Sequence, residues 1–318
     1  RRQRQMCIRD RSIEAQRALR MTIVAEVAQA YYELVALDTE LDIVKQTLKA
    51  REEGVRLARI RFAGGLTSET SYRQAQVELA RTATLVPDLE RKISLKENDI
   101  AFLAGEYPNR IARSRLLQEF NSPETLPVGL PSTLLERRPD IRQAEASLAQ
   151  AFYATGAARS AFYPSITLGG SAGWTNSTGA AIINPGRWLL SAVGSLTHPL
   201  FNRGRNIANL RIAKAQQQEA LLSFQQSLLK AGSEVNDALA QWQTADRRLQ
   251  LDGKQIAALR RTVESTRQLM EHSSSTTYLE VLTAQQSLLS AELTEANDHF
   301  DKIQGMINLY HALGGGSW

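Results

Sequence analysis

The side chains that most often bind a metal ion or act as a nucleophile are few in this sequence. Four histidines are present, and no two have the spacing of ligands on one helical turn: His198, His272, His299 and His311. The single cysteine, Cys7, excludes a disulfide framework and a cysteine-based zinc site. No grouping of Ser, His and Asp for nucleophilic catalysis can be argued. We therefore expect neither an enzyme nor a metal site nor a cofactor.

Gly314–Gly316 is the one run of three glycines that could suggest a phosphate-binding loop. A phosphate loop precedes a helix, because the helix N-terminus holds the anion. This run instead follows a predicted helix. We interpret it as a helix cap followed by a flexible tail.

The basic character of the chain is concentrated at its start. With 38 Lys and Arg against 33 Asp and Glu the net charge is +5, and residues 1–11 carry +4 of it through five Arg and one Asp. The rest of the chain, at +1, does not favour a nucleic-acid partner. Residues 1–11 have no apolar periodicity and no helix cap, and we interpret them as a non-native tail.

The composition is typical of a folded, mainly helical protein. Of 318 residues, 43% are hydrophobic, 22% charged and only 6% aromatic, with long stretches of Ala, Leu, Gln, Glu and Arg. The mean hydropathy is −0.30. Because no run of about 18 uncharged apolar residues occurs, a transmembrane helix is not expected.

Two long stretches carry apolar residues at strict seven-residue spacing, which is the pattern of a coiled coil. In the first, over about 12–62, these residues are Val27, Leu34, Leu41, Leu48, Val55 and Phe62. In the second, over about 203–271, they are Leu221, Leu228, Val235, Trp242, Leu249, Ile256, Val263 and Met270. At 1.5 Å per residue the second helix is expected to be about 100 Å long.

Each long helix is followed by a small polar or glycine-containing turn and then by a return helix. The return helices are expected over 69–104 and 278–313, and each stops at a glycine, Gly105 or Gly314, as a C-cap would. Pro87 is expected to kink the first of them. The two hairpins match each other at an offset of 208–209 residues, which indicates an internal repeat.

The centre of the chain has a different pattern, because eight of the nine prolines lie between Pro108 and Pro199. Apolar and small polar side chains alternate over 165–174 and again over about 188–200, which predicts two strands. One face of this pair is apolar, and the other carries Ser, Thr and Gly together with Val193.

The predicted strand pair fits a transmembrane β-hairpin, since strands of about ten residues with two such faces can cross a bilayer. Trp174 and Trp188 lie at its loop end, where an aromatic girdle is expected. A hairpin packed on a soluble core is the alternative. A lone hairpin has unpaired edges in a membrane, so several chains must close a barrel together, with the long helices as a tube below it.

Several motifs carry a resemblance to a known family. They are Leu134-Leu-Glu-Arg-Arg-Pro-Asp-Ile-Arg-Gln-Ala-Glu, Ala158-Arg-Ser-Ala-Phe-Tyr-Pro-Ser-Ile-Thr-Leu, Pro199-Leu-Phe, and the turns Gly65-Leu-Thr-Ser and Tyr278-Leu-Glu-Val-Leu-Thr-Ala-Gln. Over about residues 12–315 the sequence resembles the TolC family of outer-membrane factors. Within it, the sequence is similar to the NodT- and OprM-type efflux lipoproteins.

The resemblance implies a homotrimer with a twelve-stranded barrel in outer-membrane lipid and a tunnel in the periplasm. The tip of the tunnel docks a periplasmic adaptor, or membrane fusion protein, of an inner-membrane pump. Family members also carry a lipidated cysteine and a first strand pair, and neither is found in this sequence. We therefore expect an N-terminally truncated version of a longer protein of the cell outer membrane.

The resemblance also assigns two sets of site residues. The adaptor-docking tips are Gly64, Gly65, Leu66, Thr67 and Ser68 in the first turn and Ser274, Ser275, Thr276 and Thr277 in the second, although every helical hairpin needs a turn. Glu280 corresponds to an acidic position of the periplasmic aperture, with Thr283 and Glu271 beside it. Three copies of Glu280 would form a carboxylate ring that attracts cations, and a solvated carboxylate on a helix face is the alternative.

The predicted fold is mainly α with a small β part. It consists of long antiparallel coiled-coil hairpins, as in the protomer of an α-barrel, and one transmembrane β-hairpin of an oligomeric β-barrel. The expected parts are a tail (1–11), the first helical hairpin (12–105), an equatorial connecting segment (106–133), a helix (134–163), the β-hairpin (164–200), the second helical hairpin (201–314) and a tail (315–318).

The predicted function is that of a passive, trimeric exit channel in a tripartite efflux system of the RND type. A soluble coiled-coil scaffold is the alternative, but a scaffold has no need for a two-faced strand pair. The exported substrate does not follow from the sequence, because the pump rather than the channel selects it.

Overall fold

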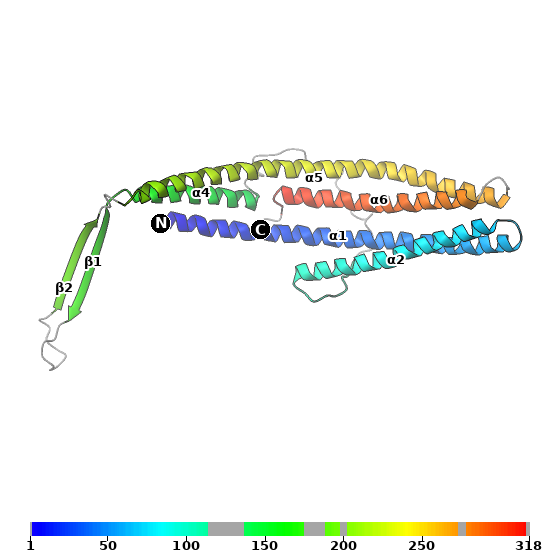
Figure 1. Cartoon of the computed structure of the whole chain (residues 1–318), viewed down its shortest axis with the longest axis horizontal. Helices are drawn as coiled ribbons and strands as arrows, with labels where there is room; N and C mark the ends of the chain where they lie inside the picture. Colours follow the sequence, from blue (N-terminus) through cyan, green and yellow to red (C-terminus); the bar gives the residue numbers. More distant parts are fainter. Residues whose placement is uncertain (1, 114–136, 175–187, 198–201, 273–277, 316–318) are drawn as a thin grey trace, which may run out of the picture. The chain divides into compact units, whose positions relative to one another are not determined.

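The structure is a computed structural model of the whole chain, and it describes residues 2–113, 137–174, 188–197, 202–272 and 278–315. The described helices and strands follow one another along the chain (Figure 1): α1 (Arg2–Ala63), α2 (Glu69–Ala104), α4 (Pro139–Ser160), β1 (Ser165–Trp174), β2 (Trp188–Thr197), α5 (Arg205–His272) and α6 (Tyr278–Ala312). The predicted fold class, mainly α with a small β part, is confirmed.

The chain divides into two compact units. The first contains residues 1–15 and 140–228, and the second contains residues 16–139 and 229–318. Helices α1 and α5 contribute to both units because of their length. Within the described residues, no helix has an apolar stretch long enough to cross a lipid bilayer.

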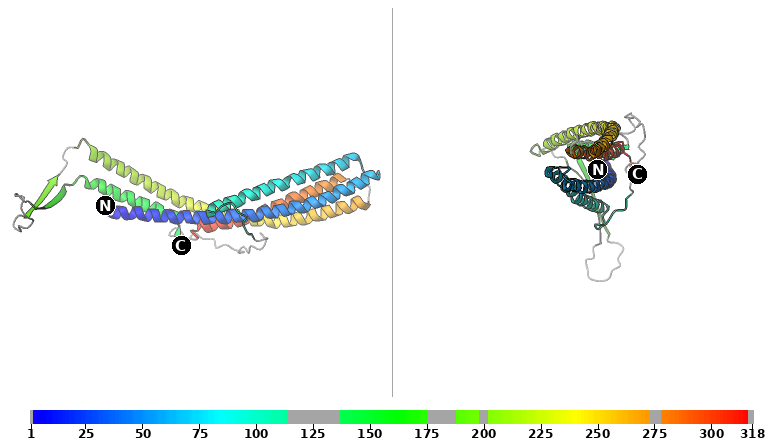
Figure 2. Two further views of the ribbon diagram at one scale, coloured as in Figure 1. Left: turned by 90° about the horizontal axis from the view of Figure 1, so that it is seen from below. Right: turned by 90° about the vertical axis from the view of Figure 1, so that its right-hand side faces the viewer.

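In the second unit, α2 and α6 both pack on α1. The predicted series of apolar residues contributes Leu34 and Leu41 to the core, and both are buried. They belong to a cluster that also takes residues from α2, among them Leu89 and Ile93, and Leu289 from α6. The seven-residue spacing therefore predicted a real packing surface, and Figure 2 shows these helices running alongside one another.

The contact between α5 and α6 relies on small side chains. A series in α6 with seven-residue spacing is buried and contains only small or short residues: Ala284, Ala291, Asp298, Gly305 and Ala312. Ala312 shares a buried cluster with Ala238 of α5. At Gly305 the two backbones approach so closely that an added Cβ atom would lie 2.9 Å from the backbone nitrogen of Trp242.

A Gly305→Ala substitution is expected to destabilise this hairpin. In an unobstructed helix, replacing glycine by alanine stabilises the helix by about 1 kcal/mol. At this position the new methyl group would also lie 3.1 Å from the Cα atom of Trp242, so α5 and α6 would have to separate. Because overpacking costs about 1–3 kcal/mol, we expect a net loss of up to about 2 kcal/mol in the free energy of unfolding, measured by urea denaturation.

Gly253→Ala is the matched control, because Gly253 lies inside α5 and an added Cβ atom would meet nothing within 4 Å. In this variant the free energy of unfolding is expected to rise by about 0.5–1 kcal/mol. Equal gains at both glycines would show that α5 and α6 do not approach each other as closely as described.

In the first unit, α4 packs beside the beginning of α5. The buried hydroxyl of Thr155 donates to the carbonyl of Ala213 at 3.1 Å, which joins the two helices. Asn206 donates to the carbonyl of Ala161 at 2.9 Å, just after the end of α4. Two specific hydrogen bonds therefore join α4 and the residue after it to the beginning of α5.

The β-hairpin of the first unit has the predicted two-faced pattern. Its antiparallel register runs from Ser165 opposite Thr197 to Trp174 opposite Trp188. One face carries apolar side chains such as Leu168, which is 86% exposed. On the polar face, hydroxyl groups pair across the strands: Ser165 with Thr197 at 2.9 Å, Thr167 with Ser195 at 2.9 Å and Ser171 with Ser191 at 2.6 Å.

The glycine caps at the ends of the return helices are confirmed. Gly105 and Gly314 have φ values of 73° and 74°, a left-handed conformation that favours glycine. In each case the N–H groups of the glycine and of the next residue donate to carbonyls of the last helical turn. This is the Schellman motif, and it satisfies carbonyls that would otherwise lack a donor.

Some boundaries differ from those expected. Helix α1 includes residues 2–11, which we expected to lie outside it because they lack an apolar period; an established helix can propagate without one. Helix α2 contains Pro87 without a break, and the kink expected there stays a prediction. Helix α4 begins at Pro139, the proline expected in its first turn, and β2 ends at Thr197 rather than near residue 200.

Candidate functional site

The first hairpin turn is rigid and presents an apolar side chain to solvent. Gly65 has a φ of 70°, and the N–H groups of Gly65 and Leu66 donate to carbonyls of the last turn of α1 at 3.0 and 2.8 Å, again a Schellman motif. Ser68 caps α2 with its side-chain oxygen. Leu66 is 73% exposed. The geometry suits a contact with another protein, since the turn needs no ordering on binding.

Arg61 joins this turn to the end of the second hairpin. Its two terminal nitrogens both donate to the carbonyl oxygen of Met270 at 3.1 Å. Met270 lies in the last turn of α5, where carbonyls have no partner within the helix. The two hairpins therefore end side by side (Figures 1 and 2). The predicted tip residues Ser274, Ser275, Thr276 and Thr277 lie outside the described residues.

A groove of about 450 Å³ lies between the beginnings of α2 and α6, next to the first turn. Its lining combines apolar and polar side chains, including Val77, Leu282, Arg73, Glu78 and Gln286. Such a mixed groove has the kinds of side chain that occur together at protein-contact surfaces, apolar groups that can be buried and polar groups that can fix orientation.

The residues predicted for the aperture lie where α5 ends and α6 begins. Glu280 and Thr283 are exposed on one face of the first two turns of α6. The Thr283 hydroxyl donates to the carbonyl of Leu279 at 2.9 Å. Glu271 is in the last turn of α5, and its side chain is outside the description. An aperture role for these residues stays a prediction.

The two tryptophans predicted for the membrane girdle are a directly opposed pair in the strand register, Trp174 opposite Trp188. Their backbones therefore lie together at the loop end of the hairpin, as the sequence suggested. Their side chains are not described, and the girdle itself stays a prediction.

Reasoning from the sequence missed a buried charged residue below the turns. Arg51 is only 3% exposed, and it belongs to a second seven-residue series in α1 whose other members are all buried: Ala30, Leu37, Val44 and Ala58. This series lies three residues after the one that we identified, as the second core position of a heptad does. A lone arginine among small and apolar residues at that spacing is the signal that could have found it.

The run Arg137-Arg-Pro-Asp has a structural explanation. Arg138 is 3% exposed and donates to the carbonyl of Ala312 at 3.0 Å, near the end of α6. Its other terminal nitrogen lies 2.6 Å from the carboxylate of Glu234 in α5. Arg138, the residue before α4, thus contacts both the last residue of α6 and Glu234 of α5.

Among the described residues, no three His, Cys, Asp or Glu side chains are grouped as a metal ion would require.

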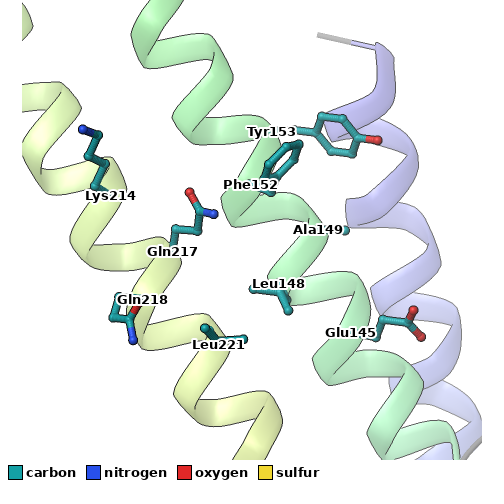
Figure 3. Close-up of a pocket in the computed structure, with 9 residues that line it drawn as sticks. All are labelled: Glu145, Leu148, Ala149, Phe152, Tyr153, Lys214, Gln217, Gln218 and Leu221. Atoms are coloured by element: carbon teal, nitrogen blue, oxygen red, sulfur yellow. The ribbon is translucent and has the colours of Figure 1, made fainter.

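A further hollow of about 610 Å³ lies in the first unit between α4 and α5 (Figure 3). Leu148 and Phe152 of α4 and Leu221 of α5 form most of its apolar lining. Of the charged residues labelled in Figure 3, Lys214 and Glu145 point to opposite sides. The charged side chains of this hollow therefore do not converge on one point, as they would in a site for a charged ligand.

Comparison with known families identifies the chain. The family described as outer membrane efflux protein matches residues 8–106 and 130–315. The chain belongs to this family. The match takes in both hairpins, α4 and the strand pair, so the resemblance found in the sequence is confirmed. It favours the efflux interpretation over the coiled-coil scaffold.

Individual relatives agree with this assignment. The cation efflux system protein CusC of Escherichia coli O6:H1 is 31% identical over 303 residues, which cover 95% of this chain and 66% of CusC. Outer membrane protein OprJ of Pseudomonas aeruginosa is 33% identical over 320 residues, covering 96% of this chain and 64% of OprJ. The structure of the outer-membrane channel OprN matches with a TM-score of 0.92 at 28% identity, covering 99% of this chain and 71% of OprN. The chain thus spans just under two thirds of the length of CusC and of OprJ.

Proposed function

We propose that this chain forms part of a passive exit channel of a tripartite efflux system in the outer membrane. Three copies would combine their β-hairpins into a barrel and their helical hairpins into a tunnel in the periplasm. An inner-membrane pump of the RND type would supply the energy and select the substrate.

One observation supports this proposal above the others, namely that a two-faced β-hairpin and long helical hairpins occur in one chain of the efflux family. The apolar strand face, with Leu168 and Leu190 86% and 82% exposed, would face lipid. The hydroxyl face would line the pore. Since a two-stranded sheet has open edges, insertion requires pairing with further strands.

The hairpin turns are proposed as the surface that contacts a periplasmic adaptor protein. The exposed Leu66 and the groove between α2 and α6 support this assignment, because together they offer a rigid apolar contact beside a polar rim. Glu280, exposed near the start of α6, is proposed to contribute to a carboxylate ring at the aperture.

Planar-bilayer conductance tests the channel function. The chain would be measured alone and with a first strand pair of a family member placed before α1. We expect the extended form to insert and conduct, and the chain alone, whose described residues supply one strand pair, to conduct little. If both forms remain soluble rods without conductance, the scaffold alternative is correct and the channel proposal is wrong.

A further inference from the structure

Arg51 connects three helices beneath the groove beside the turns. One terminal nitrogen, Nη1, donates to the backbone carbonyl of Glu78 at 2.7 Å and to its carboxylate at 2.9 Å. The other, Nη2, donates to the side-chain oxygen of Gln286 at 2.7 Å. The guanidinium of α1 therefore holds one residue of α2 and one of α6, and these two residues line the groove.

The burial of this arginine makes its contacts position-sensitive. A charged group away from water is tolerated only where its partners are in place, and losing a partner costs far more than at the surface. A polar residue at a core position of a coiled coil also specifies register, because other registers leave it without partners. If α6 slid along α2, Nη2 would lose Gln286 while Nη1 kept Glu78.

We propose that Arg51 is a positioning residue that fixes the register and spacing of α6 against α2, and thereby sets the width of the groove beside the hairpin turns. The effect of this positioning on adaptor docking and on the placement of Glu280 rests on the proposed function. The positioning itself is a property of the folded chain and can be measured without transport.

Amide hydrogen exchange over residues 279–287 of α6 tests this proposal. Arg51→Met keeps most of the side-chain volume and removes the three hydrogen bonds, and we expect exchange in this segment to become about tenfold faster while the rest of the chain changes little. Arg56→Met is the matched control on the same helix, because the Arg56 side chain is 67% exposed and only pairs with Glu53 at 2.9 Å. The control is expected to exchange as the wild type does.

A second variant keeps the test decisive if Arg51→Met does not fold. Gln286→Ala removes only the arm that reaches α6, and it is expected to accelerate exchange in 279–287 while leaving Arg51 paired with Glu78. Arg51→Lys is expected to be intermediate, because an ammonium group cannot reach both partners as a planar fork does. Spin labels at Thr70 and Ser287, both exposed and lining the groove, should show a broader distance distribution in Arg51→Met and Gln286→Ala.

Unchanged exchange and distances in both variants would overturn the proposal. Uniformly faster exchange along all helices would also overturn it, since that is the signature of a general contribution to stability. If the variants show the local loosening but the extended form of the chain never conducts, the positioning role is kept and the channel function is rejected, so the two failures are distinguishable.

Discussion

A Leu66→Asp chain is expected to fold and assemble as the wild type does and to lose export. Leu66 is 73% exposed in a turn held by backbone hydrogen bonds, so the substitution removes little that stabilises the fold. In the proposed docking surface it would place a carboxylate at an apolar contact. A polar or charged substitution at the centre of an interface often weakens the free energy of binding by about 2 kcal/mol or more. We therefore expect adaptor binding to be at least about thirtyfold weaker.

Resistance of cells that depend on this protein to the substrates of its partner pump would measure export, and cross-linking in whole cells would measure assembly. Leu66→Met is the matched control, because it keeps an apolar side chain of similar size, and it should export normally. Gly65→Asp is a less direct test, since the φ of 70° at Gly65 strains any side chain. Wild-type export by a stable Leu66→Asp chain would rule out docking at this turn.

Asp298→Asn is expected to stabilise the second hairpin at neutral pH by about 3 kcal/mol, which corresponds to the shift in the pKa of Asp298. Asp298 is 1% exposed in the small-residue series of α6. Burial raises the pKa of its carboxyl from 3.8 to about 6, the neighbouring Asp252 acts in the same direction, and the positive charge of Arg248, 2.7 Å away, opposes both. The protonated form is thus the one that the folded hairpin prefers.

The sign of the pH dependence follows from these values. The folded state holds the Asp298 proton up to about pH 6, whereas the unfolded chain releases it near pH 3.8. The contribution of Asp298 to the free energy of unfolding is therefore fully present below about pH 4, and it is lost as the pH rises through about 6. The asparagine that replaces Asp298 cannot ionise, so the variant and the wild type should be equally stable at about pH 4 and diverge toward pH 7.

Urea denaturation at several pH values between about 4 and 7 measures this difference. Asp301→Asn is the comparison variant, because Asp301 is 42% exposed, lies 3.8 Å from the same arginine and makes the last of the contributions that raise the pKa of Asp298. Its difference from the wild type should change with pH in the same direction as that of Asp298→Asn, but by much less. A constant difference between Asp298→Asn and wild type across this range would contradict the raised pKa.

The parts of the fold that depend on local patterns could be predicted from the sequence. The bounds expected for the first return helix, 69–104, are those of α2, because Ser68 and Gly105 mark both ends chemically. Period-two alternation likewise located β1 over residues 165–174. In both cases the signal lies within the segment itself.

The parts that depend on contacts between helices were not predicted. A charged residue in a helix is normally solvated, and the sequence analysis did not single out Arg51 or Asp298, because the neighbours that cover them lie on other helices. The close approach at Gly305 depends equally on the backbone of Trp242, 63 residues earlier in the chain. For the candidate site, the first turn followed from sequence, but the arginine that ties it to α5 did not.

The paired hydroxyls of the β-hairpin have a consequence for what could pass along them. In each pair, such as Thr167 with Ser195, either oxygen can be the donor, because an O–H bond rotates without moving any heavier atom. A hydroxyl group of this kind can donate a hydrogen bond to an anion or accept a cation at its oxygen, at similar energy. If this face lines the pore, as proposed, it would bind solutes of either charge only weakly, and their passage would be set by diffusion and by the width of the lumen.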